Sequence, residues 1–542
     1  MDAVTSPPAP RNEPIKDYAP GSPERAELQA KLQELTDQGP IDLPSTIHGE
    51  QRMAGGRRIE VVAPHEHAKV LGVTANASHA DAHAAVVAAR AAAPGWRALS
   101  FDDRAAVLLK AADLLAGPWR STLNAATMLG QSKTAYQAEI DAACELIDFW
   151  RFNVEFGRRI MAEQPVSSAG VWNRSDHRPL EGFVYAVTPF NFTAIAGNLS
   201  TAPALMGNTV VWKPAPTQQF AAHYLMRLLT EAGLPPGVIN LVTGDGIDVS
   251  DVVLAESDLA GIHFTGSTAV FQMLWQQVGA RIGSYRSYPR IVGETGGKDF
   301  ILAHPSADSD VLTVAMIRGA FEFQGQKCSA ASRAYVPRSL WDRIGDDFVA
   351  QVEGLRQGPT TDFSNFLSAV IDRKSFDRLA AVLERARADD TVQIVAGGTC
   401  DDSTGYFVRP TVLVGEDPTR EYFREEYFGP VLAVHVYDDA DYDAVLSQLE
   451  GISPYALTGS ILAGDREVIA SATEALRFAA GNFYINDKPT GAVVGQQPFG
   501  GGRASGTNDK AGAMQNLMRW TSTRSIKETF VPATDYRYPF MD

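Results

Sequence analysis

The chain has 542 residues, of which 45% are hydrophobic and 21% charged, and its formal net charge is −16. This length predicts about two to four globular domains, because it exceeds what one core holds. The negative charge excludes nucleic acid and anionic membranes as favoured partners. There is no apolar run of about 18 residues, so no transmembrane helix is expected. The only cysteines are Cys144, Cys328 and Cys400, which favours a reducing, cytoplasmic location and fits no zinc site.

Residues 1–45 are expected to form an N-terminal arm, with a helix over 23–38 that Ser22 caps. Hairpin-like strands over 46–74 come next, followed by four helices. The last of these helices is long, over 135–161. Cys144 lies in its apolar stripe and is predicted to be a buried core residue. Glu145 lies beside the stripe and fits either a solvated face or a functional site.

Residues 171–187 are predicted to form two strands around a polar turn at 173–176. An exposed hairpin of this kind often pairs with a partner subunit. The tail over 519–526 is predicted to add one more strand that is available for the same exchange. Both segments therefore indicate a homo-oligomer.

Strands and helices alternate in the middle of the chain, which predicts a doubly wound parallel sheet with ligands at the carboxyl ends of its strands. The usual Gly-x-Gly-x-x-Gly fingerprint is incomplete, because Val249 takes the third glycine position. Ser267 is a predicted helix N-cap whose neighbouring N–H groups suit a pyrophosphate. Lys213 ends another strand and suits ribose or phosphate, although a solvated charge fits equally well. The same alternation over 299–500 predicts a second α/β domain.

Glu294 lies in a glycine-rich turn, and Cys328 follows 34 residues later among small residues. A cysteine can attack a carbonyl carbon when its thiolate is stabilised. A helix beginning at Cys328, together with the adjacent Lys327, would provide that stabilisation. The alternative is a buried structural cysteine. Cys400 lies in an acidic turn, where nearby carboxylates would raise its pKa and disfavour catalysis.

Six motifs occur in an order that resembles the aldehyde dehydrogenase superfamily from about residue 45 to the C-terminus. Three further segments, at 321–330, 495–501 and 503–510, look like the branch that oxidises L-glutamate γ-semialdehyde. The six motifs are TPFNF at 188–192, WKP at 212–214, FTGS at 264–267, ETGGK at 294–298, QKC at 326–328 and EYFGP at 426–430.

The resemblance implies an α/β fold with two doubly wound domains and a β-hairpin and tail for oligomerisation. It implies the NAD-dependent oxidation of L-glutamate γ-semialdehyde, which forms from Δ1-pyrroline-5-carboxylate, to L-glutamate in proline degradation. The implied divisions are an arm at 1–45, an NAD-binding domain at 46–165 and 183–295, a catalytic domain at 296–505, and an oligomerisation element at 166–182 and 515–542.

The resemblance also implies roles for individual residues, and no metal. Pro216 stands where many NAD-preferring members carry an acid, so use of NADP stays open. Ala492 stands where the family often has a serine, which removes one hydroxyl from the carboxylate anchor. The implied catalytic residues are Cys328 as nucleophile, Asn191 as oxyanion donor and Glu294 as general base. The implied cofactor residues are Thr188, Lys213, Gly266, Ser267, Thr268, Glu426 and Phe428. The implied substrate residues are Glu145, Phe192, Ser329, Gly491, Ala492 and Phe499.

Other functions compatible with these residues stay open. They are another aldehyde dehydrogenase of the same fold, such as a CoA-acylating one, and a catalytically silent binding protein. A fragment of a bifunctional proline-catabolic protein is a further alternative. The expected partners are a second copy of the chain, as a homodimer or higher oligomer, and a proline dehydrogenase that docks transiently.

Overall fold

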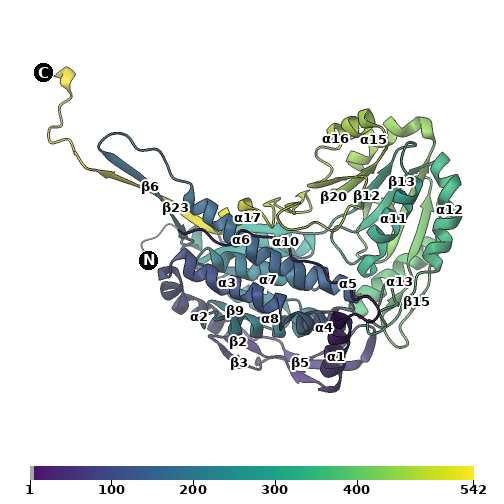
Figure 1. Cartoon of the computed structure of the whole chain (residues 1–542), viewed down its shortest axis with the longest axis horizontal. Coiled ribbons are helices and arrows are strands. Elements are labelled where there is room, and N and C mark those ends of the chain that lie inside the picture. Colours follow the sequence, from purple (N-terminus) through teal and green to yellow (C-terminus); the bar gives the residue numbers. More distant parts are fainter. Residues whose placement is uncertain (1–4, 542) are drawn as a thin grey trace.

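Two seven-stranded sheets organise the chain in the computed structural model, which describes residues 5–541 (Figure 1). The first sheet has the order β11-β10-β7-β8-β9-β2-β3, and its first five strands are parallel. Parallel strands of this kind point their carboxyl ends to one edge of the sheet. Its strands are β2 (Ser45–Ile47), β3 (Glu50–Arg52), β7 (Phe183–Thr188), β8 (Thr209–Pro214), β9 (Ile239–Leu241), β10 (Leu259–Thr265) and β11 (Arg290–Glu294).

Helices cover both faces of the first sheet, because its strands present apolar side chains on both sides. Val184 and Ala186 of β7 pack toward one core, while Phe183 and Tyr185 pack toward the other. The first core is formed with α3 (Phe101–Ala116), α4 (Arg120–Gln131), α7 (Thr193–Leu205) and α8 (Gln219–Ala232), and the second with α2 (His79–Ala98), α9 (Gly246–Val253) and α10 (Thr268–Ala280).

The second sheet has the order β14-β17-β18-β13-β12-β20-β21 and is also covered on both faces. The predicted α/β fold with two doubly wound sheets is therefore confirmed. The strands are β12 (Asp299–Ala303), β13 (Ala331–Pro337), β14 (Val392–Ala396), β17 (Thr411–Gly415), β18 (Val431–Tyr437), β20 (Thr458–Leu462) and β21 (Asn482–Ile485), and the helices are α11 (Ser309–Phe321), α12 (Arg338–Glu353), α13 (Arg373–Ala388), α14 (Glu421–Arg424), α15 (Tyr442–Ile452) and α16 (Arg466–Ala475).

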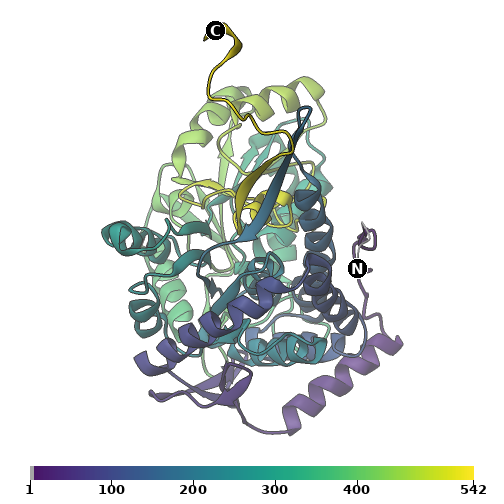
Figure 2. The same cartoon turned by 90° about the vertical axis from the view of Figure 1, so that its left-hand side faces the viewer.

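The N-terminal helix α1 (Pro23–Asp37) begins as predicted, because the Ser22 hydroxyl accepts a hydrogen bond from the Arg25 amide. Leu28, Leu32 and Leu35 bury its apolar side in the core that contains α4, at the lower edge of the molecule in Figure 2. A three-stranded sheet follows, made of β1 (Ile41–Asp42), β4 (Arg58–Ala63) and β5 (Glu66–Ala75).

The predicted hairpin over 171–187 is wrong. Residues 171–179 form one strand, β6 (Val171–Pro179), which pairs antiparallel with the tail strand β23 (Thr521–Thr529). The polar residues at 173–176 signal a local turn, but they lie within a ladder to residues some 350 positions away in sequence. Arg174 pairs with Glu528 and Arg524 with Asp176 across this ribbon, which projects from the body in Figure 1. The predicted tail strand is confirmed.

The predicted long helix over 135–161 is helical throughout but not uniform. It consists of α5 (Ala135–Ala138), a π-helical turn (Glu139–Cys144) and α6 (Glu145–Ala162), and Cys144 is buried as expected. No helix within residues 5–541 is both long and apolar enough to span a membrane. The short elements are β15 (Cys400–Asp401), β16 (Phe407–Val408), β19 (Tyr455–Ala456), β22 (Gly502–Arg503) and α17 (Met514–Met518).

Candidate active site

The carboxyl-terminal edge of the first sheet gathers the residues that the sequence assigns to cofactor binding. Thr188 ends β7 and Lys213 is the next-to-last residue of β8. Thr265 of β10 is in register with Glu294 of β11, so the turn that follows β10 begins beside Glu294. The structure therefore shows the strand ends meeting at one edge of the sheet, as expected.

Each of these side chains has a defined neighbour. The Lys213 amine is buried and donates to the Gly244 carbonyl oxygen at 3.5 Å, and burial lowers its pKa to about 8. The Thr188 hydroxyl accepts from the Trp212 indole at 2.9 Å. The Thr268 hydroxyl donates to that of Thr295 at 3.1 Å.

Helix α10 begins at this edge with features that fit an anionic ligand. Ser267 caps the helix by accepting from the Val270 amide at 3.4 Å, and the first turn carries no acidic residue. The free N–H groups and the helix dipole of such a terminus favour a pyrophosphate. Together with the buried lysine amine near the end of β8, two strands away from β10 in the sheet, these residues fit a dinucleotide.

Two further candidates for the cofactor come from the loop between α14 and β18, which leads into the second sheet. A carboxylate oxygen of Glu426 accepts from the Gly297 amide at 2.9 Å, and burial raises its pKa to about 7. A Cβ on Gly296 would lie 1.9 Å from that carboxylate, so a larger residue there would displace the Glu426 side chain. Phe428 has a left-handed backbone and contacts the ring of Phe190 edge to face, with centroids 5.8 Å apart.

Cys328 lies in a turn that precedes β13 and not at a helix start, so that part of the prediction is wrong. The Lys327 amine forms an ion pair with Glu322 at 3.4 Å. Burial raises the pKa of the Cys328 thiol well above its usual value, and the carboxylates of Asp299, Glu426 and Glu294 raise it further. The predicted stabilisation of the thiolate by the helix dipole and the adjacent lysine is thus not what this structure provides.

The other two predicted catalytic residues flank this turn. A carboxylate oxygen of Glu294 accepts from the Gly501 amide at 3.0 Å, and burial raises the Glu294 pKa well above its usual value. The buried Asn191 side chain donates to the Gln326 carbonyl oxygen at 3.1 Å, two residues before Cys328.

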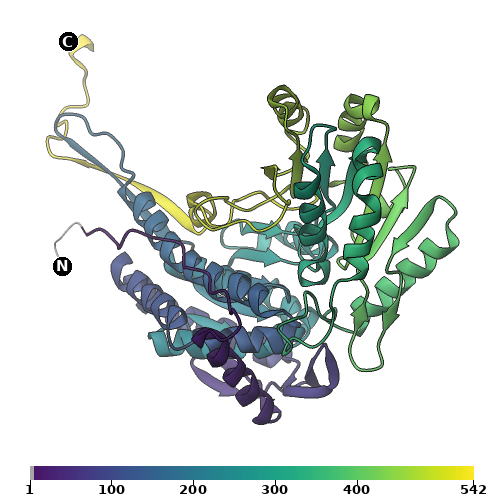
Figure 3. The same cartoon turned by 45° about the vertical axis from the view of Figure 1, so that its right-hand side comes forward.

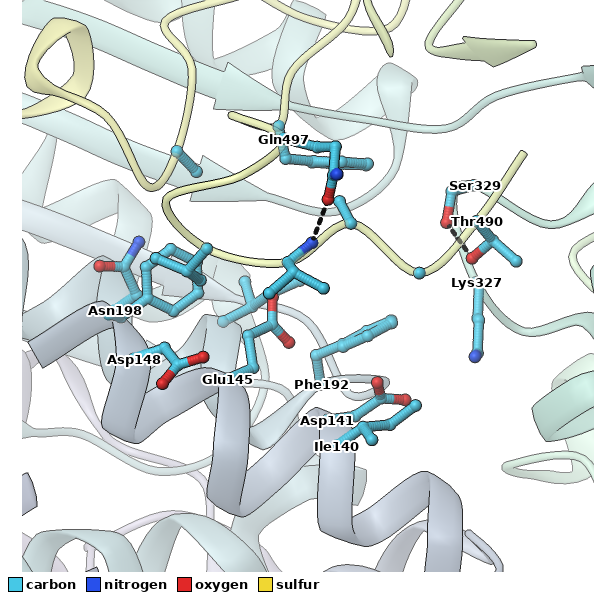
Figure 4. A pocket seen from close by; sticks show the side chains of 18 of the residues that line it. Ile140, Asp141, Glu145, Asp148, Phe192, Asn198, Lys327, Ser329, Thr490 and Gln497 are labelled. Carbon is cyan, nitrogen blue, oxygen red and sulfur yellow. Dashed lines mark hydrogen bonds between the residues drawn. The ribbon is translucent and has the colours of Figure 1, made fainter. Parts of the chain in front are cut away.

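One cavity of about 440 Å³ joins the predicted catalytic and substrate residues (Figure 4). Within it, the Ser329 and Thr490 hydroxyls are hydrogen-bonded at 2.7 Å. Gly491 has φ +97°, a conformation that favours glycine. Asn191 is not among the lining residues. The predicted residues that line the cavity are Glu145, Phe192, Glu294, Cys328, Ser329, Gly491, Ala492 and Phe499.

Sequence reasoning missed several residues in or beside this cavity. Asn12 and Glu13 of the N-terminal arm line it. Lys133 does not line the cavity, but it is fully buried against two residues that do, with its amine 4.1 Å from the centroid of the Phe192 ring and in an ion pair with Asp141. No local signal marks these residues, because the arm reaches the site only through contacts that are distant in sequence.

The sheet edge, the buried thiol and the carboxylates beside it define the class of protein. The chain belongs to the aldehyde dehydrogenase family, whose model matches residues 52–526.

Individual proteins show which members of the family this chain is similar to. The chain is 49% identical over 540 residues to a probable delta-1-pyrroline-5-carboxylate dehydrogenase of Schizosaccharomyces pombe, covering 98% of each chain. It is 49% identical to the mitochondrial delta-1-pyrroline-5-carboxylate dehydrogenase of Bos taurus, covering 98% of this chain and 94% of the relative. The crystal structure of the Mycobacterium tuberculosis delta-pyrroline-5-carboxylate dehydrogenase bound with NAD is 62% identical over the whole of both chains, with a TM-score of 0.97.

Proposed function

We propose that this protein oxidises L-glutamate γ-semialdehyde, formed by hydrolysis of Δ1-pyrroline-5-carboxylate, to L-glutamate with NAD. The observation that carries the proposal is the single cavity in which Cys328 and Glu294 lie with Ser329, Gly491 and Ala492. This arrangement combines a nucleophile and a carboxylate with hydroxyl and backbone groups that suit the amino-acid end of the substrate. The names of the relatives agree with that substrate.

In the first half of the reaction, the sulfur of Cys328 forms a bond to the aldehyde carbon, and its proton leaves for a base or water. The oxygen that becomes negative is held by the Asn191 side-chain amide and the Cys328 backbone N–H. When bound, NAD would supply the acceptor for the hydride of the substrate carbon, and Lys213, Ser267 and Glu426 would hold it. A thioester on Cys328 remains.

In the second half, Glu294 takes a proton from the water that attacks this thioester, and the Cys328 sulfur leaves. The raised pKa of Glu294 suits this role, because a carboxylate with a higher pKa is a stronger base towards the attacking water. Glutamate then departs with two carboxylates.

The amino-acid end of the substrate is recognised at the other side of the cavity. Ser329 and the backbone of Gly491 and Ala492 bind the carboxylate, and Phe192 and Phe499 pack on the aliphatic stem. Glu145 meets the ammonium group at the start of α6 (Figure 4).

The environment of Glu145 agrees with this last role. Burial raises the Glu145 pKa well above its usual value, since its carboxylate has lost contact with water. A substrate ammonium would restore the charged form.

The test mixes pyrroline-5-carboxylate with NAD and follows NADH with and without CoA. We expect NADH formation that CoA does not alter, and no activity from a Cys328→Ala variant. A Glu294→Gln variant should release about one equivalent of NADH per site and then stop, with a mass increase on Cys328 from the trapped acyl group. Oxidation of simple aliphatic aldehydes without oxidation of pyrroline-5-carboxylate would refute the proposal.

We further propose that the β6–β23 ribbon and the tail join two copies of the chain into a homodimer or a higher oligomer. The supporting observation is a set of large apolar side chains that the single chain leaves exposed: Trp172, Phe530, Val531, Tyr536 and Phe540. Analytical ultracentrifugation of the full chain and of a chain that ends at Thr529 tests this. An unchanged mass after truncation, or a monomeric full chain, would contradict it.

A cytoplasmic location is proposed because all three cysteines, each within the described residues, are free. A fluorescent fusion that localises to another compartment would contradict it. A proline dehydrogenase is proposed as a transient partner, since it would form the substrate that this site accepts. Co-sedimentation of the two purified proteins tests this, and independent sedimentation at all concentrations would argue against it.

A further inference from the structure

An extended segment before α1, residues 11–18, runs along α6 toward α1 (Figure 3), and we call it the strap. The Lys16 amide and the Tyr18 hydroxyl donate to the Glu139 carboxylate at 2.9 and 2.7 Å. The Glu13 carboxylate forms ion pairs with Arg120 at 2.5 Å and with Arg151 at 2.7 Å. The strap is therefore fixed to the π-turn and α6 by buried or half-buried charged hydrogen bonds, which are the stronger kind.

Asn12 connects the strap to both walls of the substrate cavity, which it also lines. Its side-chain amide donates to the Asp148 carboxylate of α6 at 2.8 Å and to the Val494 carbonyl oxygen at 2.8 Å. Its oxygen accepts from the Gln496 side chain at 2.9 Å. The two N–H groups and the oxygen of the Asn12 amide thus all form hydrogen bonds, and these bonds join α6 to the loop over 491–497.

That loop is a closed unit, so a contact at one of its residues constrains the others. The Gln497 side chain accepts from the Val493 amide at 3.0 Å, as Figure 4 shows, and the Gln496 and Gln497 amides donate to the Val493 carbonyl oxygen at 3.0 Å each. Val494 follows Ala492 by two residues. The position of the Gly491 and Ala492 backbone therefore depends on where Val494 is held.

We propose that Asn12 is a positioning residue that sets the affinity for the substrate carboxylate by holding the 491–497 loop against α6. This inference rests on the proposed function, because it assumes that Gly491 and Ala492 bind that carboxylate. Asn12 itself acts through the loop and not on the reacting atoms.

The test compares Asn12→Ala and Asn12→Asp with the wild type and with Asp17→Asn, a substitution at an exposed strap residue. Asn12→Asp keeps the size of the side chain but places a carboxylate against the acceptors of Asp148 and Val494, which removes two hydrogen bonds and adds repulsion. The measurements are the dissociation constant for L-glutamate by calorimetry, KM and kcat with pyrroline-5-carboxylate, and kcat/KM with propanal, which has no carboxylate.

We expect roughly tenfold weaker binding of L-glutamate and a roughly tenfold higher KM in Asn12→Ala, because the loop loses its hydrogen bonds to the strap. Asn12→Asp should weaken the binding of L-glutamate and raise KM at least as much. In both Asn12 variants, kcat with pyrroline-5-carboxylate and kcat/KM with propanal should change less than twofold. In the Asp17→Asn control, every measured value should change less than twofold. A general loss of folding would lower propanal oxidation in parallel and would overturn the proposal.

Wild-type affinity in both Asn12 variants would also overturn it. If the wild type oxidises pyrroline-5-carboxylate and binds L-glutamate while the variants match it, the inference about Asn12 alone is wrong. If the wild type does neither, the proposed function is wrong, and the inference falls with it.

Discussion

Ser329→Ala is the substitution that most directly tests how the site recognises its substrate. Ser329 is buried beside Cys328, and its hydroxyl is hydrogen-bonded to that of Thr490 at 2.7 Å. A hydrogen bond from a hydroxyl to a charged carboxylate contributes about 1.5–3 kcal/mol in a buried site. Removing it should raise KM for pyrroline-5-carboxylate roughly 10- to 150-fold. The kcat should change little, because the carboxylate is remote from the reacting carbon.

Thr490→Val provides the matched control. Both variants lose the same hydrogen bond between two hydroxyls, so both should lose about 0.5–1.5 kcal/mol of the free energy of unfolding. Only Ser329→Ala also loses the contact with the substrate. Steady-state kinetics and thermal unfolding of both variants measure the two effects. An equal rise in KM in both variants would show that the rise comes from disturbed packing, and the assignment of Ser329 would be refuted.

Three further predictions concern other parts of the site. Ala492→Ser should lower KM for pyrroline-5-carboxylate roughly fivefold, because it adds a hydroxyl to a half-exposed anchor; an unchanged KM would contradict this. Gly297→Ala should lower the free energy of unfolding by about 1–3 kcal/mol, since the new Cβ would lie 2.6 Å from the carbonyl oxygen of Cys328. Gly283→Ala, with nothing within 4 Å of its Cβ, is the control in chemical denaturation. KM for NAD should be lowest between about pH 7 and 8, because Lys213, with a pKa lowered to about 8, loses its charge as pH rises, and Glu426, with a pKa raised to about 7, loses its charge as pH falls. A flat KM from pH 6 to 9.5 would contradict the two assignments.

The sequence predicted the sheet edge well, because the signals there are local and repeated. Thr188, Lys213 and Glu294 each end or nearly end a strand, and the alternation of strands and helices makes those strands parallel. Ser22 and Ser267 were predicted as N-caps and are N-caps, since capping depends on the next three residues alone.

The features that were not predicted depend on distant parts of the chain. The polar run at 173–176 has the composition of a turn, but pairing with β23 supplies ladder hydrogen bonds that a turn lacks. Cys328 follows a stretch in which Phe323 and Gln324 have left-handed backbones, which ends the helical geometry before the cysteine. Sequence spacing alone cannot show that break, because neither residue is a glycine or a proline.

The catalytic residues and the residues proposed to contact the substrate lie within the region that the family model matches, but the strap proposed to hold the 491–497 loop lies outside it. Cys328 and Glu294 lie within the region that the family model matches, 52–526, whereas the strap precedes it. Reaction at an aldehyde needs only the shared sheet edge and the thiol. A substrate with a carboxylate also needs a loop that is held in place, and Asn12 reaches that loop from outside the matched region through hydrogen bonds with Val494 and Gln496. Changes in the strap should therefore alter which aldehydes the site accepts while leaving the thiol chemistry intact.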